Sequence, residues 1–196
     1  MNKRPRFWRW YRTVPILAMA LVCALSFGLA GLPQTAMRRL FFPVRHESAI
    51  IESSSRHGVD PLLTCAIIKC ESNWNEAAVS AAGAVGLMQM MPSTSSELAD
   101  WGVVDVWSYD PSNLTDPETN IEYGCAYLGQ LQTHLGSLDE VVAAYNAGPG
   151  SVEEWLSGGG DIADVIGFPE TALYLRRVNE TYERYQQLYT ETLDPR

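Results

Sequence analysis

Histidine and cysteine are scarce in this chain, and neither is placed as a metal site would require. The 196 residues include three histidines, which lie far apart at His46, His57 and His134. None of them is close in sequence to a cysteine at the spacing that zinc ligands show. We therefore expect no metal site, and no other feature of the sequence implies an organic cofactor.

The four cysteines do not suggest a disulfide framework either. Cys23 falls in an apolar run, and the other three, an odd number, cannot all pair within the chain. Cys65 and Cys70 are five residues apart on a predicted helix, which puts their Cα atoms roughly 8–9 Å apart, too far for a disulfide. Cys65, Cys70 and Cys125 have apolar neighbours, and we expect them to be small buried side chains.

Basic residues are missing from most of the chain. Residues 1–44 hold seven Lys and Arg and no acid, whereas residues 45–196 hold the other seven and all 23 acids, a net charge of −16. This charge excludes a nucleic-acid binder, which needs a basic face to meet phosphates. The hydrophobic content of 46% excludes a disordered acidic tail. Residues 45–196 are long enough for one compact domain with its own core.

Charge of either sign is absent from residues 13–37, and Val14–Leu32 is almost wholly apolar. A helix of about 20 such residues spans the ~30 Å hydrocarbon core of a bilayer. Five basic residues precede this run, and Trp8, Trp10 and Tyr11 lie where an aromatic belt would meet the interface. We therefore predict a single-pass anchor in the cytoplasmic membrane.

The expected organisation of the chain follows from this anchor and from the rule that basic flanks stay inside. It consists of a basic cytoplasmic N-terminus, a transmembrane anchor, a juxtamembrane linker and an outer domain, at residues 1–12, 13–37, 38–44 and 45–196. The alternative is a cleaved secretory signal, because Gly28-Leu-Ala30 has the small residues of a cleavage site. In both cases the outer domain works outside the cytoplasmic membrane.

The outer domain shows no strand-like alternation of useful length, no internal repeat and no low-complexity segment. Its apolar residues recur at helical spacing, so we predict a single, mostly α domain. Ser137 and Ser151 each open a capping box, and each is expected to start a helix. The other predicted helices are residues 45–57, 61–72, 93–101, a long helix that Asp116-Pro117 opens, and 169–191.

Glu71 is the first candidate for chemistry. It ends the most apolar predicted helix, where desolvation and the negative end of the helix dipole both raise the pKa of a carboxyl. A carboxylic acid that is still protonated near neutral pH can donate a proton to a leaving group. On this segment alone, the alternative is a helix-terminal glutamate that faces water.

Several other segments follow Glu71 in a fixed order. A glycine-hinged loop with Gln89 and three methionines offers amide hydrogen bonds and an apolar surface, both of which sugars need. The ordered set is Glu71-Ser-Asn-Trp-Asn75, Ser80-Ala-Ala-Gly-Ala-Val-Gly-Leu-Met-Gln-Met-Met-Pro92, Asn120-Ile-Glu-Tyr-Gly-Cys-Ala-Tyr-Leu128, Ala144-Tyr-Asn-Ala-Gly-Pro-Gly150 and Phe168-Pro-Glu-Thr171. Together these segments resemble the catalytic domain of the soluble-lytic-transglycosylase family, over about residues 45–190.

This resemblance implies a lysozyme-like helical fold and an enzyme that cleaves peptidoglycan. Members of the family cut the β-1,4 bond between N-acetylmuramic acid and N-acetylglucosamine without adding water. The muramic 6-hydroxyl attacks the anomeric carbon and leaves a 1,6-anhydro end. By this resemblance, Glu71 is the sole general acid/base, first protonating the leaving oxygen and then accepting the proton of the 6-hydroxyl.

The resemblance also assigns binding residues on both sides of the cleft. The Tyr145 hydroxyl is expected to orient the catalytic carboxyl, and Glu170 and Tyr174 are expected to close the far side. The full set of expected substrate-binding residues is Ser80, Gln89, Met91, Tyr145, Asn146, Glu170 and Tyr174. The expected partners are peptidoglycan glycan strands and, through the N-terminal helix, the membrane.

Two positions depart from the family pattern. Glu76 stands where the family usually has proline, and this change is expected to alter only a turn. Ala172 stands where an arginine commonly follows the Glu-Thr pair, which removes a cation near Glu170.

Two other functions fit the same residues. One is a muramidase hydrolase on the same fold, with a downstream acid that activates water. The other is a wall-binding scaffold that keeps the cleft without turnover.

Overall fold

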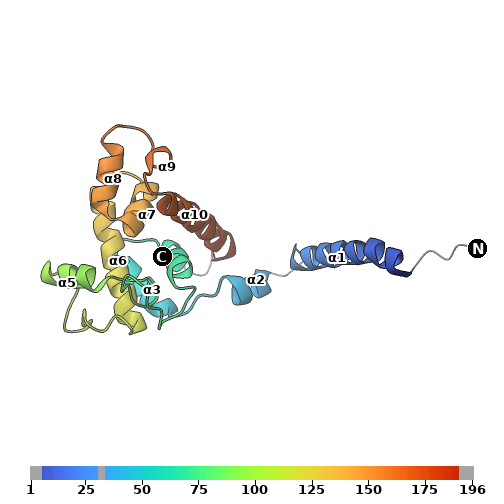
Figure 1. The fold of residues 1–196 in the computed structure, drawn as a ribbon. Coiled ribbons are helices and arrows are strands. Elements are labelled where there is room, and N and C mark those ends of the chain that lie inside the picture. Colours follow the sequence, from blue (N-terminus) through green and yellow to red (C-terminus); the bar gives the residue numbers. More distant parts are fainter. Residues whose placement is uncertain (1–5, 31–33, 190–196) are drawn as a thin grey trace, which may run out of the picture. The chain divides into compact units, whose positions relative to one another are not determined.

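The computed structural model describes residues 6–30 and 34–189, which are mostly helical, with longer non-helical segments at residues 72–91 and 101–116 (Figure 1). The chain divides into two units, residues 1–43 and residues 44–196. The first unit contains α1 (Arg6–Ala30) and α2 (Gln34–Phe41), so α2 covers part of the segment expected as a linker. In the described part of the chain, no helix is both long and apolar enough to cross a membrane, so the predicted anchor is not supported.

The second unit is mostly α, as predicted. Its helices are α3 (Glu47–His57), α4 (Pro61–Glu71), α5 (Pro92–Asp100), α6 (Pro117–His134), α7 (Leu138–Ala147), α8 (Pro149–Leu156), α9 (Ile162–Val165) and α10 (Pro169–Tyr189). The short helix α9 is not among the predicted elements. Residues 190 and 191, at the predicted end of the last helix, lie outside the described residues.

The predicted starts of three helices are confirmed by their capping bonds. The Asp60 carboxylate accepts from the Leu62 N–H before α4, and Asp116 accepts from the Thr119 N–H before α6. The Ser137 hydroxyl accepts from the Glu140 N–H and begins α7. These side chains satisfy donors that the first helical turn leaves without a partner.

The capping box predicted at Ser151 is wrong. α8 begins at Pro149, after Gly148 with φ 83°, so Ser151 already lies inside the first turn. Its hydroxyl donates to the Ala147 carbonyl at 2.9 Å instead of capping a helix. Glycine in the left-handed region and proline at the first helical position outweigh the local Ser-x-x-Glu pattern.

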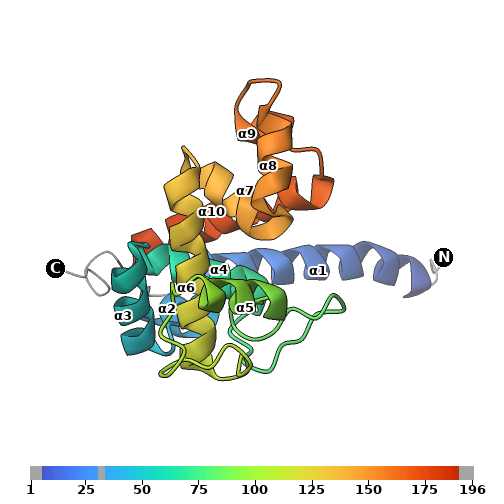
Figure 2. The same ribbon diagram turned by 90° about the vertical axis from the view of Figure 1, so that its left-hand side faces the viewer.

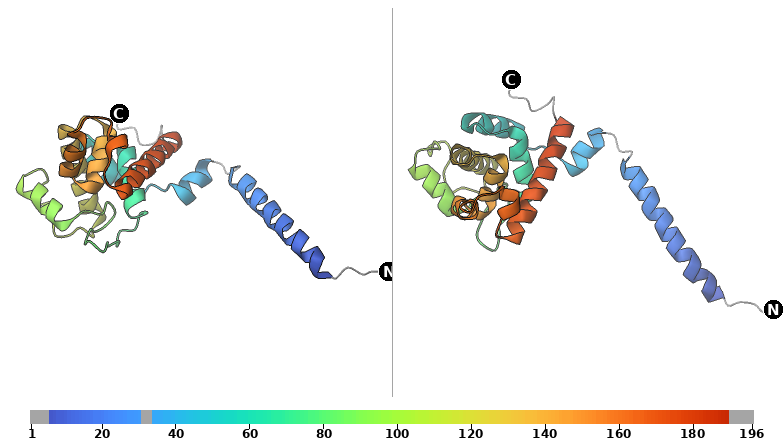
Figure 3. Two further views of the ribbon diagram at one scale, coloured as in Figure 1. Left: turned by 45° about the horizontal axis from the view of Figure 1, so that its top comes forward. Right: turned by 90° about the horizontal axis from the view of Figure 1, so that it is seen from above.

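The core forms where α4 and α6 are covered by α10 and α3. α10 packs along α4, and α3 packs against α6 (Figures 2 and 3). Leu63, Ile67 and Ile68 of α4 are fully buried, as its apolar sequence predicts. α8 and α9 lie at the end of this unit opposite α3.

The cysteines are all free thiols. Cys65 and Cys125 are fully buried, as predicted. Cys70 is only half-buried, and its thiol donates to Thr181 Oγ1 of α10 at 3.5 Å.

Candidate active site

Glu71 is the last residue of α4, and the chain turns sharply just after it. Asn73 and Trp74 both have positive φ angles, 51° and 66°. A bulky residue rarely adopts this left-handed conformation unless packing imposes it. Trp74 is buried, and its indole N–H donates to the Tyr185 hydroxyl at 3.1 Å. The buried Trp74 side chain and its hydrogen bond to Tyr185 therefore fix the turn that follows Glu71.

Tyr174 of α10 holds the Glu71 carboxyl directly. The Tyr174 hydroxyl donates to Glu71 Oε1 at 2.7 Å, although 103 residues separate the two in sequence. The Tyr174 ring is buried, with 4% of its surface exposed. The packing of α10 on α4 therefore fixes the orientation of the carboxyl.

The environment of Glu71 favours the protonated acid, as the sequence predicts. Burial raises the pKa of Glu71, and the Tyr174 hydrogen bond and the Arg177 charge offset only part of this rise. Burial and the nearby Glu71 carboxyl raise the pKa of Tyr174 far above its ordinary value. Tyr174 therefore remains a neutral donor at any physiological pH.

Tyr145 does not make the hydrogen bond to Glu71 that was expected of it. Its hydroxyl donates to the Met88 carbonyl at 2.8 Å, with Met90 Sδ 3.4 Å away. The Glu71 charge nevertheless contributes to the raised pKa of Tyr145, after the larger effect of burial. Tyr145 thus lies near the carboxyl and ties α7 to the loop before α5, while Tyr174 takes the orienting contact.

The segment 78–91, here called the site loop, is folded on itself by two of the predicted residues. The Ser80 hydroxyl accepts from the Ala84 N–H at 3.0 Å and closes a tight turn. Gln89 has φ 49°, and its amide nitrogen donates to the Ala78 and Gly86 carbonyls at 3.1 and 2.9 Å. Both side chains shape the loop, and both are half-buried.

Asn120 joins the site loop to α6, a role that the sequence analysis did not assign. Its side chain accepts from the Met88 N–H at 2.7 Å and donates to the Val85 carbonyl at 2.8 Å and the Leu114 carbonyl at 2.9 Å. Asn120 is fully buried. A Cβ at Gly86 would overlap this amide, so the glycine lets the loop close onto α6. The local sequence carries no clear signal for this contact, because Asn120 lies among other polar residues at the start of α6, Glu118, Thr119 and Glu122.

The remaining predicted residues lie on exposed parts of the same region. Met91 directly precedes α5, and 37% of its surface is exposed. Asn146, near the end of α7, accepts from the buried Thr171 hydroxyl at 2.9 Å. Glu170 precedes Thr171 in the first turn of α10 and is exposed. The structure therefore joins the end of α7 to the start of α10, beside Tyr174.

Glu76, at the position where the family pattern has proline, makes a side-chain hydrogen bond to His46. Its Oε1 lies 2.8 Å from His46 Nε2, next to the start of α3. Glu76 therefore links the turn after Glu71 to the segment just before α3, at the start of the second unit.

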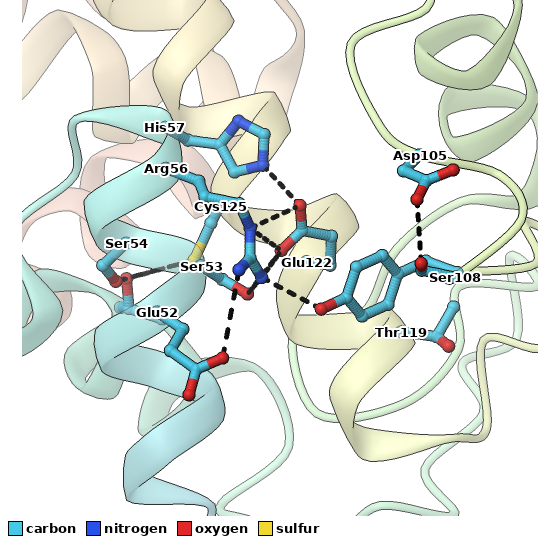
Figure 4. A network of polar contacts seen from close by, with 12 residues as sticks. Glu52, Ser53, Ser54, Arg56, His57, Asp105, Ser108, Thr119, Glu122 and Cys125 are labelled. Carbon is cyan, nitrogen blue, oxygen red and sulfur yellow. Dashed lines mark hydrogen bonds and ion pairs between the residues drawn. The ribbon is translucent and has the colours of Figure 1, made fainter.

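A second buried carboxylate, Glu122, lies between α6 and α3 and was also missed (Figure 4). Its oxygens are 2.6 Å from Arg56 Nη2, 2.8 Å from His57 Nε2 and 2.5 Å from Ser53 Oγ. Burial alone would raise the pKa of Glu122, but the hydrogen bonds from His57, Arg56 and Ser53 outweigh it and lower the pKa to about 2. Glu122 is therefore an anion that fastens two helices, and it is not a proton donor.

Within the described residues, no cluster of three or more His, Cys, Asp or Glu side chains could hold a metal ion.

Comparison with known proteins identifies the family. Residues 48–164 match the family described as the transglycosylase SLT domain. The chain belongs to this family. The SLT match covers α4, the site loop and α7, and ends just before α10, which carries Tyr174.

Named relatives and solved structures agree with the SLT assignment. The chain is 34% identical over 154 residues to the soluble lytic murein transglycosylase of Escherichia coli, matching 74% of this chain and 24% of the relative. It is 34% identical over 166 residues to membrane-bound lytic murein transglycosylase C of Edwardsiella ictaluri, matching 69% of this chain and 45% of the relative. The chain thus spans less than half the length of these relatives.

Among solved structures, the 70 kDa soluble lytic transglycosylase of Escherichia coli is similar with a TM-score of 0.69 and 31% identity, over 79% of this chain and 26% of that one. The structure of an inactive mutant of the lytic transglycosylase Slt from Pseudomonas aeruginosa is similar with a TM-score of 0.68 and 31% identity, over 76% of this chain and 25% of that one. These likenesses support the lysozyme-like, SLT-type fold.

Proposed function

We propose that this chain is a peptidoglycan lytic transglycosylase with Glu71 as its only general acid/base. The observation that carries the proposal is the Glu71–Tyr174 pair: a half-buried glutamate with a raised pKa, whose carboxyl is held at 2.7 Å by a neutral donor. The substrate class follows from the names of the relatives, which are lytic murein transglycosylases.

One carboxyl is enough if the substrate supplies the nucleophile. Glu71 first gives its proton to the glycosidic oxygen as the bond to the muramic anomeric carbon breaks. The resulting carboxylate then takes the proton of the muramic 6-hydroxyl as that oxygen bonds to the anomeric carbon. The products are a free hydroxyl on N-acetylglucosamine and a 1,6-anhydro muramic end, and Glu71 returns to its acid form.

The surroundings of Glu71 suit this double role. The groups that shift its pKa, besides burial, are Tyr174 and Arg177, and neither is a carboxylate. Glycosidases that activate water or form a covalent intermediate place a second carboxylate roughly 5–9.5 Å from the acid. An intramolecular hydroxyl replaces that group and gains the advantage of proximity.

We place the substrate against the surface that Tyr145, Asn146 and the site loop form beside Glu71. Ser80 and Gln89 hold the loop in shape, so their contribution to sugar binding is the fixed position of the backbone groups. Met91 offers exposed apolar surface, and Glu170 and Tyr174 contribute from the start of α10. No cofactor takes part in this scheme.

The test is the variant Glu71→Gln, which keeps the shape of the side chain and removes its proton chemistry. Release of soluble fragments from purified sacculi should fall by at least about 10²–10⁴-fold, the usual contribution of a general acid. Thermal unfolding should remain cooperative and no less stable, because the change removes a costly buried acid. Fragment release at the wild-type rate would rule out Glu71 as the acid.

The location of the domain is a separate part of the proposal. One relative is membrane-bound by name, and residues 1–37 combine a basic start with a charge-free run. We place the SLT domain outside the cytoplasmic membrane, tethered by this segment or released by cleavage near Ala30. Fractionation of cells that express the whole chain tests this, since recovery in the cytoplasm would contradict both versions.

A further inference from the structure

Arg177 lies one turn after Tyr174 on α10 and contacts the tyrosine that holds Glu71. Its guanidinium carbon is 5.7 Å from the centroid of the Tyr174 ring. A cation at this distance from an aromatic face is attracted to it. On the other side of the same residue, the Tyr174 hydroxyl is 2.7 Å from Glu71 Oε1. The cation, the ring and the carboxyl therefore form a continuous chain of contacts.

Cations are rare in the part of the sequence that builds the site. Residues 70–175 contain no Lys or Arg, although they contain sixteen Asp and Glu. The first turn of α10 adds no cation, because Glu170 and Thr171 are followed by Ala172 and Leu173. A positive charge for Glu71 must therefore come from another position, and α10 supplies it at Arg177.

The other titratable groups near Glu71 that its charge affects are neutral at physiological pH. Tyr174 of α10 and Tyr145 of α7 both have a pKa far above the ordinary value because of burial. Burial also raises the pKa of the Cys70 thiol on α4, so it remains protonated. Arg177 is thus the charged member of this group.

We propose that Arg177 is a positioning residue for the reaction, one that steadies the Tyr174 ring and stabilises the Glu71 carboxylate. This inference rests on the proposed function, in which Glu71 must be an acid before bond cleavage and a base after it. Burial favours the acid, and a nearby positive charge favours the anion that proton donation leaves behind. Arg177 lowers the free energy needed to form the Glu71 carboxylate, and it does so without contacting the substrate.

The test compares three variants of the full-length chain. Arg177→Gln removes the charge, Arg177→Lys keeps it, and Arg176→Gln removes an equal charge from the adjacent position on α10, which is exposed like Arg177. In each, the carboxyl ¹³C signal of Glu71 is titrated by NMR, and its assignment comes from its loss in Glu71→Gln. Because Arg177 lowers the pKa of Glu71, its removal should move the titration midpoint to higher pH.

We expect the titration midpoint of Glu71 to rise in Arg177→Gln and to stay near the wild-type value in Arg176→Gln. In Arg177→Lys, the midpoint should lie closer to the wild-type value than to that of Arg177→Gln. A midpoint in Arg177→Gln that matches the wild type would overturn the proposal. An equal rise in Arg176→Gln would overturn it too, because that rise would reflect net charge alone. A drop in melting temperature without a change in midpoint would make Arg177 a structural residue only.

Failure of this inference is distinguishable from failure of the proposed function. The titration needs no turnover, so it measures the Arg177 effect even if the chain releases no anhydro product. Where the chain is active, the alkaline limb of its rate profile should move to higher pH in Arg177→Gln, because Glu71 then stays protonated to higher pH. An unmoved alkaline limb despite a moved midpoint would remove Arg177 from the reaction.

Discussion

At the residue scale, the Tyr174 hydroxyl has two separate effects on Glu71. It fixes the orientation of the carboxyl, and it stabilises the anion by donating to it. Tyr174→Phe removes both effects and leaves the ring in place. A hydrogen bond to a charged group is worth about 1.5–3 kcal/mol, so we expect sacculus cleavage to slow by roughly 10–100-fold.

The matched control for Tyr174→Phe is Tyr182→Phe, on the same helix. The Tyr182 hydroxyl donates to Asp60 at 2.6 Å, so this control also removes a tyrosine–carboxylate bond, but one away from Glu71. Initial rates over a range of pH should show the loss in Tyr174→Phe and not in Tyr182→Phe. Equal losses would mean that the hydroxyl acts on the stability of α10 and not on the acid.

The local sequence around Glu71 was enough to predict its raised pKa, because an apolar helix holds its last residue at a half-buried, partly desolvated position. It was not enough to identify which tyrosine binds the carboxyl. Tyr145 and Tyr174 both lie in recognisable segments, and the choice depends on how α10 packs along α4. The Arg177 contact depends on the same packing. Asn120 was missed for a similar reason, since its partners are backbone groups of the distant site loop.

At the scale of elements, the site loop depends on a close contact with α6. A Cβ at Gly124 would overlap the Met88 side chain and come within 3.0 Å of its Cβ, and Met88 is fully buried. Gly124→Ala should therefore lower the free energy of unfolding by about 1–3 kcal/mol. It should also reduce cleavage, because Met88 is bound by Tyr145 and Asn120.

Gly150→Ala is the control for this change. Gly150 lies in α8 with open space around its Cβ position, so alanine there should be neutral or stabilise by about 0.4–1 kcal/mol. Urea unfolding and sacculus digestion of both variants give the two measurements. A Gly124→Ala protein as stable and as active as Gly150→Ala would contradict the proposed contact.

The junction of α3 and α6 should make the domain sensitive to acid through Glu122. The pKa of Glu122 is lowered in the folded state, to about 2 from 4.5. The contribution of ionised Glu122 to the free energy of unfolding is therefore complete above its ordinary pKa of 4.5. It is lost as the pH falls from about 4.5 towards 2. Glu122→Gln should lower the free energy of unfolding near neutral pH by about 1.5–3 kcal/mol, and should flatten the acid limb of the stability profile.

Glu52→Gln tests whether this effect belongs to the buried network. Glu52 is exposed and lies 4.0 Å from the same Arg56, so its loss should cost less than about 0.5 kcal/mol. Urea unfolding at pH 3 and pH 7 measures both variants. An acid limb that is unchanged in Glu122→Gln would assign acid sensitivity to other carboxylates.

Helix starts were predictable where the cap residue and the residue after it agree, as at Asp60-Pro61 and Asp116-Pro117, or where the cap has no competitor, as at Ser137. The Ser151 prediction failed because Gly148 and Pro149 begin α8 before the serine is reached. The short helix α9 could not be found by apolar spacing, because four residues span little more than one turn.

At the scale of the whole molecule, the charge of −16 on residues 45–196 limits how the domain meets its substrate. The proposed substrate is a mostly anionic cell-wall polymer, so under the proposed function long-range attraction does not bring it to the domain. The proposal therefore requires short-range contacts, which we place around Glu71, Tyr145 and the site loop. The order of the sequence motifs identified the SLT fold because the motifs at Glu71, the site loop and α7 meet at one site.

The central claim is that one carboxyl cleaves the glycan without water. The most direct measurement is mass spectrometry of the soluble fragments that the full-length chain releases from purified sacculi, with Glu71→Gln digested in parallel. We expect muramic ends one water lighter than a reducing end from the wild-type chain, and no such ends from the variant. Reducing muramic ends from the wild-type chain would contradict it and indicate a hydrolase with a second acid, and binding without fragments would indicate a scaffold.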